Sequence, residues 1–299
     1  SAPAQAPEPV VAAVPPRQPT EELASLLGRP PVRLTPLGGG DVAEAYAVDL
    51  DGGDRLFAKT HAAAPPGFFS TEAAGLAWLR QPGVIDVPEV VAVSDDPAWL
   101  VLEWIEPGQP HADTEADLGR ALAALHRSGA PSFGREDRRT TGSRRLPNDP
   151  CDTWVEFYAD RRLRPLARLA ADGRDLPRHA IAGLEQVADR LDRLGGPPEP
   201  PARLHGDLWA GNRVVGEGGV SWLLDPAAHG GHREFDLAMM RLFGGFGDAC
   251  FAAYEEVTPI ADGWRERVPL HQLAPLVVHA IKFGGGYVGA TERALDALR

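Results

Sequence analysis

The fold of this chain is decided by Leu204-His205-Gly206-Asp207-Leu208-Trp209-Ala210-Gly211-Asn212, which is followed by Asp225-Pro226-Ala227. Three side chains with oxygen atoms stand here in a fixed order: Asp207, Asn212 five residues later, and Asp225 thirteen residues after that. Mg²⁺ prefers oxygen ligands in near-octahedral geometry and is commonly held by one or two carboxylates together with substrate phosphates. The segment therefore indicates a site for a metal-bound phosphate compound.

The spacing of Asp207 and Asn212 is that of the catalytic loop in protein kinases. We predict that Asp207 orients an acceptor hydroxyl and takes its proton, and that Asn212 and Asp225 hold Mg²⁺. A His-Gly-Asp tripeptide alone is explained equally well by a turn with a capping Asp. The three residues together, in a helix–loop–hairpin context, favour catalysis. We expect His205 to be a structural hydrogen-bonding residue rather than a base.

Lysine is rare in this chain: of 30 basic residues only Lys59 and Lys282 are lysines. Lys59 lies in an apolar strand, where a lysine either reaches solvent at an edge or holds the phosphates of a nucleotide. Glu72 follows on a predicted helix, and a strand Lys paired with a helix Glu fixes phosphate position in protein kinases. We therefore predict a Lys59–Glu72 pair that binds ATP. Lys282 is interpreted as a surface charge.

Other candidate nucleotide contacts are weaker. Gly38, Gly39 and Gly40 lie between two predicted strands ahead of Lys59, where backbone N–H groups can approach phosphate oxygens. A plain hairpin turn explains these glycines equally well. Backbone groups around Glu103 and Ile105, near the predicted boundary between two lobes, are placed to bind an adenine edge.

Three further side chains flank the predicted catalytic loop. Trp209 either stacks on a sugar ring or packs in the core. Glu234 and Asp236 are expected to brace the catalytic loop or to cap the next helix.

The hydrophobic pattern predicts an α+β, two-lobed, protein-kinase-like fold. Residues 1–19 are Pro- and Ala-rich and are expected to form a mobile tail. Residues 20–105 are predicted to form a small antiparallel lobe with one inserted helix, and residues 106–299 a larger, mainly helical lobe. The expected strands are 32–37, 42–50, 55–60, 89–93, 99–105, 213–215 and 220–224. The expected helices are a short one that is capped by Thr20 and stops near Gly28, then 69–80, 112–128, 152–171 and 176–194, with mostly helix after 234.

Composition excludes several classes of protein. The net charge of −12 argues against nucleic acid or an anionic membrane as the main partner, because both require a cationic surface. Only two cysteines are present, Cys151 and Cys250, which argues against a disulfide scaffold or a zinc site. No apolar run is long enough for a transmembrane helix. We expect a cytoplasmic protein, and a monomer is favoured.

Several motifs together resemble the fructosamine kinase (ketosamine-3-kinase) family. They are the segment 205–212, the Asp225-Pro226-Ala227 element, the segments 236–239 and 242–246, and Phe283-Gly284-Gly285-Gly286-Tyr287. The resemblance extends to residues 38–41 and 154–163 and covers roughly residues 20–290. The Trp after His-Gly-Asp-Leu, and Asp-Pro-Ala in place of Asp-Phe-Gly, separate this family from protein kinases.

The resemblance implies a kinase that uses ATP and Mg²⁺ and acts on the C3 hydroxyl of a ketoamine (a ribulosamine, erythrulosamine or fructosamine) as a deglycation step. By position, the functional residues Lys59, Glu72, Asp207, Asn212 and Asp225 carry over. Two departures are visible. Asp41 stands where some members carry a Cys, and residues 226–230 lack the aromatic side chains often seen there.

Two alternatives stay open. One is a phosphotransferase of the same fold that acts on an aminoglycoside or another small-molecule hydroxyl. The other is a non-catalytic, nucleotide-binding pseudokinase.

Overall fold

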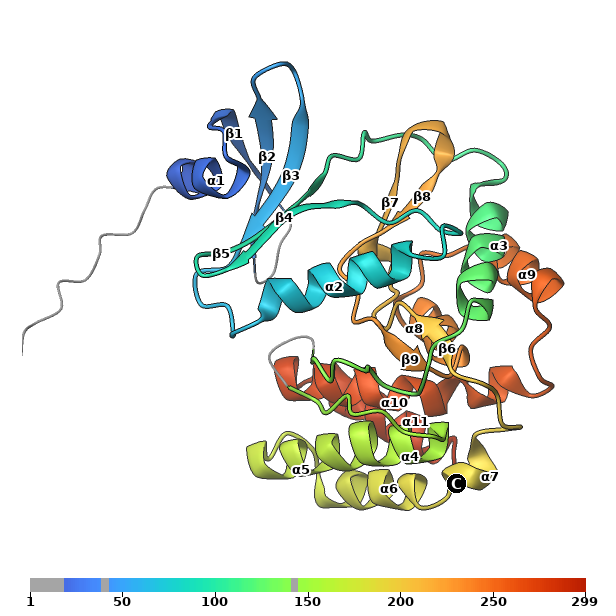
Figure 1. Cartoon of the computed structure of the whole chain (residues 1–299). Coiled ribbons are helices and arrows are strands. Elements are labelled where there is room, and N and C mark those ends of the chain that lie inside the picture. Colours follow the sequence, from blue (N-terminus) through green and yellow to red (C-terminus); the bar gives the residue numbers. More distant parts are fainter. Residues whose placement is uncertain (1–18, 39–42, 141–144) are drawn as a thin grey trace, which may run out of the picture.

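The computed structural model describes residues 19–38, 43–140 and 145–299. A five-stranded antiparallel sheet forms the first lobe, with the strands in the order β1-β2-β3-β5-β4 (Figure 1). Its strands are β1 (Pro31–Leu37), β2 (Glu44–Leu50), β3 (Arg55–Thr60), β4 (Val90–Asp95) and β5 (Ala98–Glu103). Helix α2 (Phe68–Arg80) is inserted between β3 and β4, and α1 (Pro19–Leu27) precedes the sheet.

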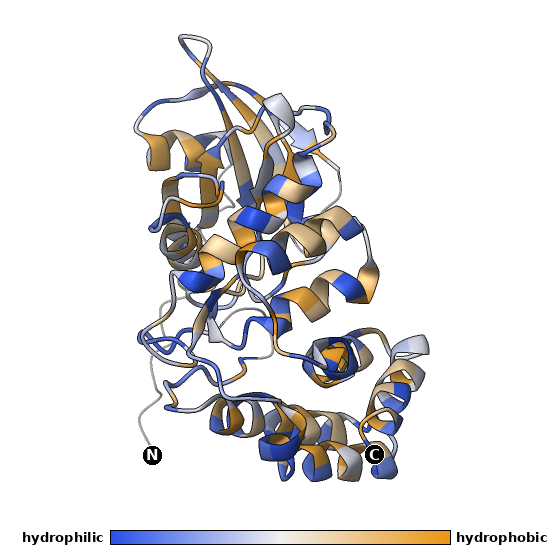
Figure 2. Ribbon diagram, turned by 90° about the vertical axis from the view of Figure 1, so that its right-hand side faces the viewer, coloured by the Kyte–Doolittle hydropathy of each residue, from blue (hydrophilic) through white to orange (hydrophobic). Residues whose placement is uncertain are grey.

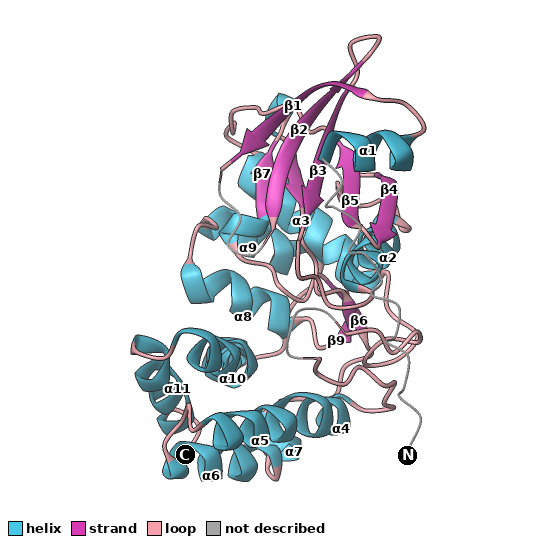
Figure 3. Cartoon of the chain, turned by 90° about the vertical axis from the view of Figure 1, so that its left-hand side faces the viewer, coloured by secondary structure: helices cyan, strands magenta, loops and turns pink. Residues whose placement is uncertain are grey.

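Strand β5 is buried on both faces, and its side chains alternate between two helices. Trp99 and Val101 pack in a cluster with Leu23 of α1, whereas Leu100 and Leu102 pack in a cluster with residues of α2. Successive strand residues point to opposite faces, so a continuous apolar run is what a strand covered on both sides requires. This part of the sheet thus lies between α1 and α2 (Figure 3).

The second lobe is mainly helical. Its helices are α3 (Thr114–Arg127), α4 (Trp154–Tyr158), the π-helical turn η1 (Ala159–Leu163), α5 (Arg164–Gly173), α6 (Arg178–Ala188), α7 (Leu191–Leu194), α8 (Glu234–Phe243), α9 (Asp248–Val257), α10 (Trp264–Phe283) and α11 (Gly286–Asp296). These helices mix hydrophilic and hydrophobic residues along their length (Figure 2). In the described parts of the chain, no helix is both long enough and apolar enough to cross a membrane.

Two short ladders carry the central loop of this lobe. Strand β6 (Ala202–Leu204) pairs with β9 (His229–Gly231), and β7 (Arg213–Val215) pairs with β8 (Ser221–Leu223). One hydrophobic cluster extends from α2 and β5 to α3 and α9, so both lobes share a core. The predicted two-lobed α+β fold is confirmed.

Local details differ from the predictions. The expected helix 152–171 contains the turn η1, and the expected helix 176–194 is interrupted at Asp189 and Arg190. This interruption separates two short helices whose buried residues, including Leu191, join one core cluster. The β6–β9 ladder was not predicted, because three-residue strands are too short to show an alternating pattern. Helix α1 begins at Pro19, which the sequence placed in the tail, and the other tail residues lie outside the described parts.

Candidate active site

A buried lysine joins the two lobes. Lys59 points from β3 toward α2, where its Nζ lies 2.8 Å from Glu72 Oε1, and 2.5 Å from Asp225 Oδ1 of the second lobe. The strand alternation explains the direction, because Phe57, two residues earlier, packs in the cluster formed with α2. The Lys59 and Glu72 side chains are only 10% and 11% exposed, whereas that of Asp225 is 56% exposed. One carboxylate thus anchors the lysine, and the other faces open space.

Burial and charge act against each other in this cluster. Burial disfavours the charged ammonium of Lys59, but the Glu72 and Asp225 carboxylates outweigh it and raise the lysine pKa. Burial raises the pKa of Glu72 to about 7, although Lys59 opposes the shift. Burial also acts against the Asp225 anion, yet the charge of Lys59 dominates and lowers the Asp225 pKa. Lys59 and Asp225 are therefore held in their charged forms near neutral pH.

Asp207 and Asn212 meet in the loop between β6 and β7. The amide Nδ2 of Asn212 donates to the backbone oxygen of Asp207 at 2.8 Å and to its Oδ2 at 3.2 Å, and it lies 3.4 Å from the backbone oxygen of Asp225. The amide nitrogen thus ties the two aspartates together. Asn212 Oδ1 makes no hydrogen bond with the described residues and is the atom left to act as a ligand.

The carboxylate of Asp207 is suited to accept a proton. Burial, together with the negative charges of Asp225 and Asp236, raises its pKa to about 6. These effects outweigh the hydrogen bond from Asn212, which lowers the pKa. A general base works best when its pKa lies near the operating pH.

Asp236 holds the catalytic loop in place through hydrogen bonds to its backbone. This fully buried carboxylate accepts hydrogen bonds from the backbone N–H groups of His205 at 2.7 Å and Gly206 at 2.9 Å, and it lies 3.2 Å from His126 Nε2. His205 Nε2 lies 2.8 Å from the backbone oxygen of Leu224. Gly206 has φ 82°, and a Cβ there would come within 2.1 Å of the Ala227 oxygen. This bracing by Asp236 agrees with one of its expected roles.

Glu234 behaves differently from Asp236. It is paired with Arg267 of α10, whose Nη2 lies 2.6 Å from Glu234 Oε1. Glu234 therefore connects α8 to α10, and it makes no hydrogen bond to the described residues of the catalytic loop. Its expected bracing role was wrong, and Asp236 alone has it. His126, which shares Asp236, was missed because a single histidine in a helix carries no spacing signal.

The other predicted residues lie around this centre. Gly38 directly follows β1 and is exposed, whereas Gly39 and Gly40 lie outside the described residues. The backbone N–H of Glu103 donates to the Glu89 oxygen at 3.0 Å and is not free for a purine. The Glu103 side chain pairs with Arg80 of α2 at 3.1 Å. Ile105 follows β5 and is partly buried.

Trp209 lies inside the catalytic loop with its side chain 40% exposed, so it is not a core residue. Its ring meets Phe243 of α8 edge-on, with the ring centroids 6.0 Å apart.

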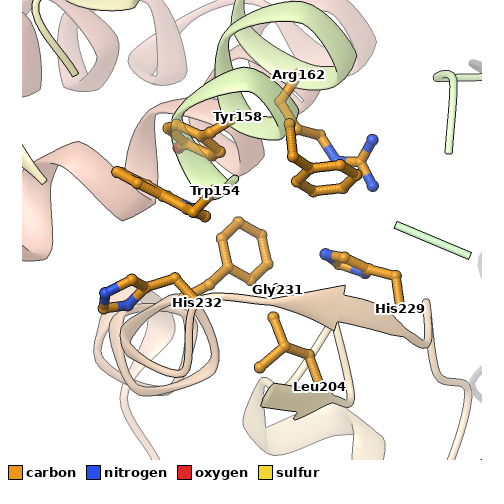
Figure 4. Close-up of a pocket in the computed structure, with 9 residues that line it drawn as sticks. Trp154, Tyr158, Arg162, Leu204, His229, Gly231 and His232 are labelled. Atoms are coloured by element: carbon orange, nitrogen blue, oxygen red, sulfur yellow. The ribbon is translucent and has the colours of Figure 1, made fainter. Parts of the chain in front are cut away.

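The Trp154 segment forms packing contacts at some distance from the lysine cluster. The rings of Trp154 and Tyr158 stack with their centroids 5.1 Å apart. Figure 4 shows them on one side of a small pocket, with Leu204 and His232 on the other side. The cavity between these elements measures about 10 Å³, too small for a sugar. Arg162 donates to the Pro147 oxygen at 2.8 Å and so holds the connector that precedes α4. This segment supports the lobe rather than lining a substrate pocket.

Comparisons with known proteins agree with this geometry. The fructosamine kinase family model matches residues 18–299. A Thermus thermophilus protein named "Probable ketoamine kinase" is 38% identical over 88% of this chain and 92% of its own length. A Synechocystis protein of the same description is 35% identical over 87% of this chain and 88% of its own length.

Solved structures agree as well. The crystal structure of a "putative fructosamine-3-kinase" from Thermobifida fusca is 40% identical, with a TM-score of 0.85 over 94% of this chain and 98% of the other. An aminoglycoside phosphotransferase, APH(4)-Ia, shares the fold with a TM-score of 0.61 at 16% identity, over 93% of this chain and 97% of the other. A match to the family model along nearly the whole chain, with relatives above 30% identity, shows that this protein belongs to the fructosamine kinase family.

Proposed function

We propose that this kinase transfers the γ-phosphoryl group of ATP to the C3 hydroxyl of a ketoamine. The observation that carries the proposal is the meeting of Lys59 of β3, Glu72 of α2 and the distant Asp225 of the second lobe, beside the Asp207–Asn212 pair. A buried lysine held between carboxylates, one of which is exposed, is suited to anionic phosphates that arrive with a metal ion.

The proposed nucleotide site extends from Lys59 along the sheet. Lys59 binds the phosphates, Glu72 holds the lysine in position, and backbone groups at Gly38, Gly39 and Gly40 approach the phosphate oxygens. Backbone groups near Ile105 and the Glu103 oxygen bind the adenine edge. A phosphotransferase of the same fold has been solved in complex with ADP and hygromycin B, which supports a nucleotide in this fold.

The residues present fit a divalent metal. Asp225 offers an exposed carboxylate and Asn212 a free amide oxygen, and both are hard oxygen ligands of the kind that Mg²⁺ prefers. Bound Mg²⁺ neutralises phosphate charge. The left-handed backbone of Asp225, with φ 50°, is a conformation that non-glycine residues rarely adopt and that is often found at functional positions.

Asp207 acts as the base of the transfer. The acceptor oxygen forms a bond to the γ-phosphorus while the bond from that phosphorus to the bridging oxygen breaks and ADP leaves. The hydroxyl proton passes to the Asp207 carboxylate. Trp209 follows two residues after Asp207 and is 40% exposed, so its ring offers a face on which a sugar can stack.

The reactivity of the phosphorylated product indicates the purpose of the reaction. A phosphate on C3 lies β to the C2 carbonyl and is a good leaving group, so the phosphorylated adduct can eliminate and release the amine. We infer that the reaction starts deglycation.

ADP release tests the proposal. Purified enzyme with ATP and Mg²⁺ is assayed with ribulose-, erythrulose- and fructose-lysine and with kanamycin, and phosphorus NMR locates the new phosphate. We expect turnover with at least one ketoamine and phosphate on C3. Turnover with kanamycin alone would favour the aminoglycoside alternative, and nucleotide binding without transfer would favour the non-catalytic one.

A further inference from the structure

A continuous aromatic surface leads away from the catalytic loop. From Trp209 it passes to Phe243 at the end of α8, then to His279 at a centroid distance of 5.2 Å. His279 lies 5.7 Å from Phe283 and 5.0 Å from Tyr287, again between ring centroids. We call Trp209, Phe243, His279, Phe283 and Tyr287 the aromatic ledge. It joins four elements: the catalytic loop, α8, α10 and α11.

The ledge is unusually open to solvent. Trp209, Phe243 and Phe283 are 40%, 40% and 53% exposed, and they are the exposed aromatic side chains among the large hydrophobic residues of the described chain. Single exposed hydrophobic residues scattered over a protein surface are normal, whereas a cluster of them indicates a binding surface. These three side chains form such a cluster next to the catalytic loop. The turn after α8 packs directly on the loop, since a Cβ on Gly245 would come within 2.4 Å of the Ala210 Cβ.

The second lysine of the chain stands at the end of this ledge. Lys282 is exposed, and its Nζ lies 4.7 Å from the centroid of the Phe283 ring. No carboxylate of the described residues lies within ion-pair distance of it. Its charge nevertheless reaches the catalytic centre, where it is one of the groups that act on the Asp207 pKa. Lys282 is thus an exposed surface charge, as the sequence indicates, and it has no carboxylate partner among the described residues.

We propose that the aromatic ledge binds the amine-bearing part of the ketoamine and that Lys282 pairs with the carboxylate of a glycated free amino acid. The proposal rests on the proposed function. A ketoamine nitrogen is a secondary amine, which is protonated at neutral pH, and aromatic faces attract such cations. The substrate then places charges of opposite sign along the ledge. Its cationic nitrogen lies over the rings, and its anionic carboxylate lies at Lys282. A lysine within a protein chain has no free carboxylate, so free adducts are preferred over glycated protein.

Two matched substrates test this assignment. They are Nε-ribulosyl-lysine, which has a free carboxylate, and Nε-ribulosyl-lysinamide, which has a neutral carboxamide in its place. We expect the wild-type KM to be about fivefold lower for the lysine adduct, the size of a partly exposed ion pair. Lys282→Met raises that KM to the value for the lysinamide adduct, and Lys282→Arg keeps most of the preference. Arg265→Met, at the opposite end of α10, leaves the ratio of the two KM values unchanged.

The outcomes separate the two proposals. Equal wild-type KM values, or a preference that survives in Lys282→Met, would overturn the role of Lys282 while the ketoamine kinase activity stands. An equal loss of kcat for both adducts in Lys282→Met would place the lysine on the phosphoryl group and would also overturn it. Absence of turnover with every ketoamine in the wild type would overturn the proposed function itself.

Discussion

The ammonium of Lys59 on β3 lies 2.8 Å from the carboxylate of Glu72 on α2, with both side chains almost enclosed by protein. A buried pair of this kind is a weak source of stability, because desolvation of the two charges cancels much of their attraction. The position of Lys59 directly after the apolar residues 56–58 of β3 points to a task for the lysine charge. That task is the basis of the first prediction.

We expect Lys59→Met to lower kcat/KM for ATP at least about 100-fold, the usual cost of removing one group that stabilises transition-state charge. Steady-state kinetics with varied ATP measures the effect. Lys59→Arg keeps the charge but replaces a compact ammonium with a planar fork, and we expect it to recover little activity. Wild-type kinetics in Lys59→Met would return the residue to a structural role.

The rate should depend on the protonation of Asp207. Because burial raises the Asp207 pKa to about 6, the carboxylate is protonated below that pH and cannot accept the hydroxyl proton. We expect kcat/KM to fall about tenfold for each pH unit below 6. Burial lowers the pKa of His205, which moves the titration of this histidine to lower pH than that of an ordinary imidazole.

Asp207→Asn supplies the control for this profile. The residual rate of the variant should be very low and should not change between pH 5 and about 7, since the titrating base is absent. Nucleotide binding, followed by fluorescence of a labelled ATP analogue, should persist. An unaltered acid limb in this variant would assign the titration to another group.

Metal dependence tests Asn212 and Asp225. We expect Asn212→Ala to raise the Mg²⁺ concentration for half-maximal activity about tenfold or more, the scale seen when groups that support a metal site are removed. Asn212→Asp restores an oxygen ligand and should recover part of the affinity. Titration of activity with Mg²⁺ at fixed ATP gives the result, and identical titration curves would exclude Asn212 as a ligand.

Stability should depend on the Glu234–Arg267 pair. Arg267→Met leaves the Glu234 carboxylate, only 2% exposed, without its main cation, and we expect the free energy of unfolding to drop by about 3 kcal/mol. Urea unfolding measures it. Arg120→Met removes an exposed pair with Asp117 and should change stability by less than about 1 kcal/mol.

The same carboxylate makes stability depend on pH. Burial raises the Glu234 pKa, but His271, whose Nε2 lies 3.4 Å from Oε2, and the hydrogen bonds from Arg267 outweigh it and lower the pKa to about 2 from an ordinary value of 4.5. The stabilisation is therefore present above pH 4.5 and is lost as the pH falls toward 2. Arg267→Met should show a flatter dependence of the melting temperature on pH in this window.

The local parts of the site could be predicted from the amino-acid sequence. The five-residue spacing of Asp207 and Asn212 lies within one loop, where chain connectivity brings the two side chains together. Short apolar runs predicted the strands β3 and β5, because a strand covered on both faces needs apolar side chains at successive positions. The family motifs of residues 205–212 added the class of enzyme.

Which distant groups share an environment follows from the three-dimensional fold. Lys59 and Asp225 are 166 residues apart, and Asp236 supports a loop 30 residues before it. Glu234 and Asp236 looked alike in the sequence, yet one faces the catalytic loop and the other faces α10. The sequence indicates a surface charge at Lys282, and the lysine is exposed; the fold adds that it lies over Phe283, at the end of the row of rings that begins at Trp209. Electric fields and packing act through space, so the role of a charged residue is set by its neighbours in the fold and not by its neighbours in the chain.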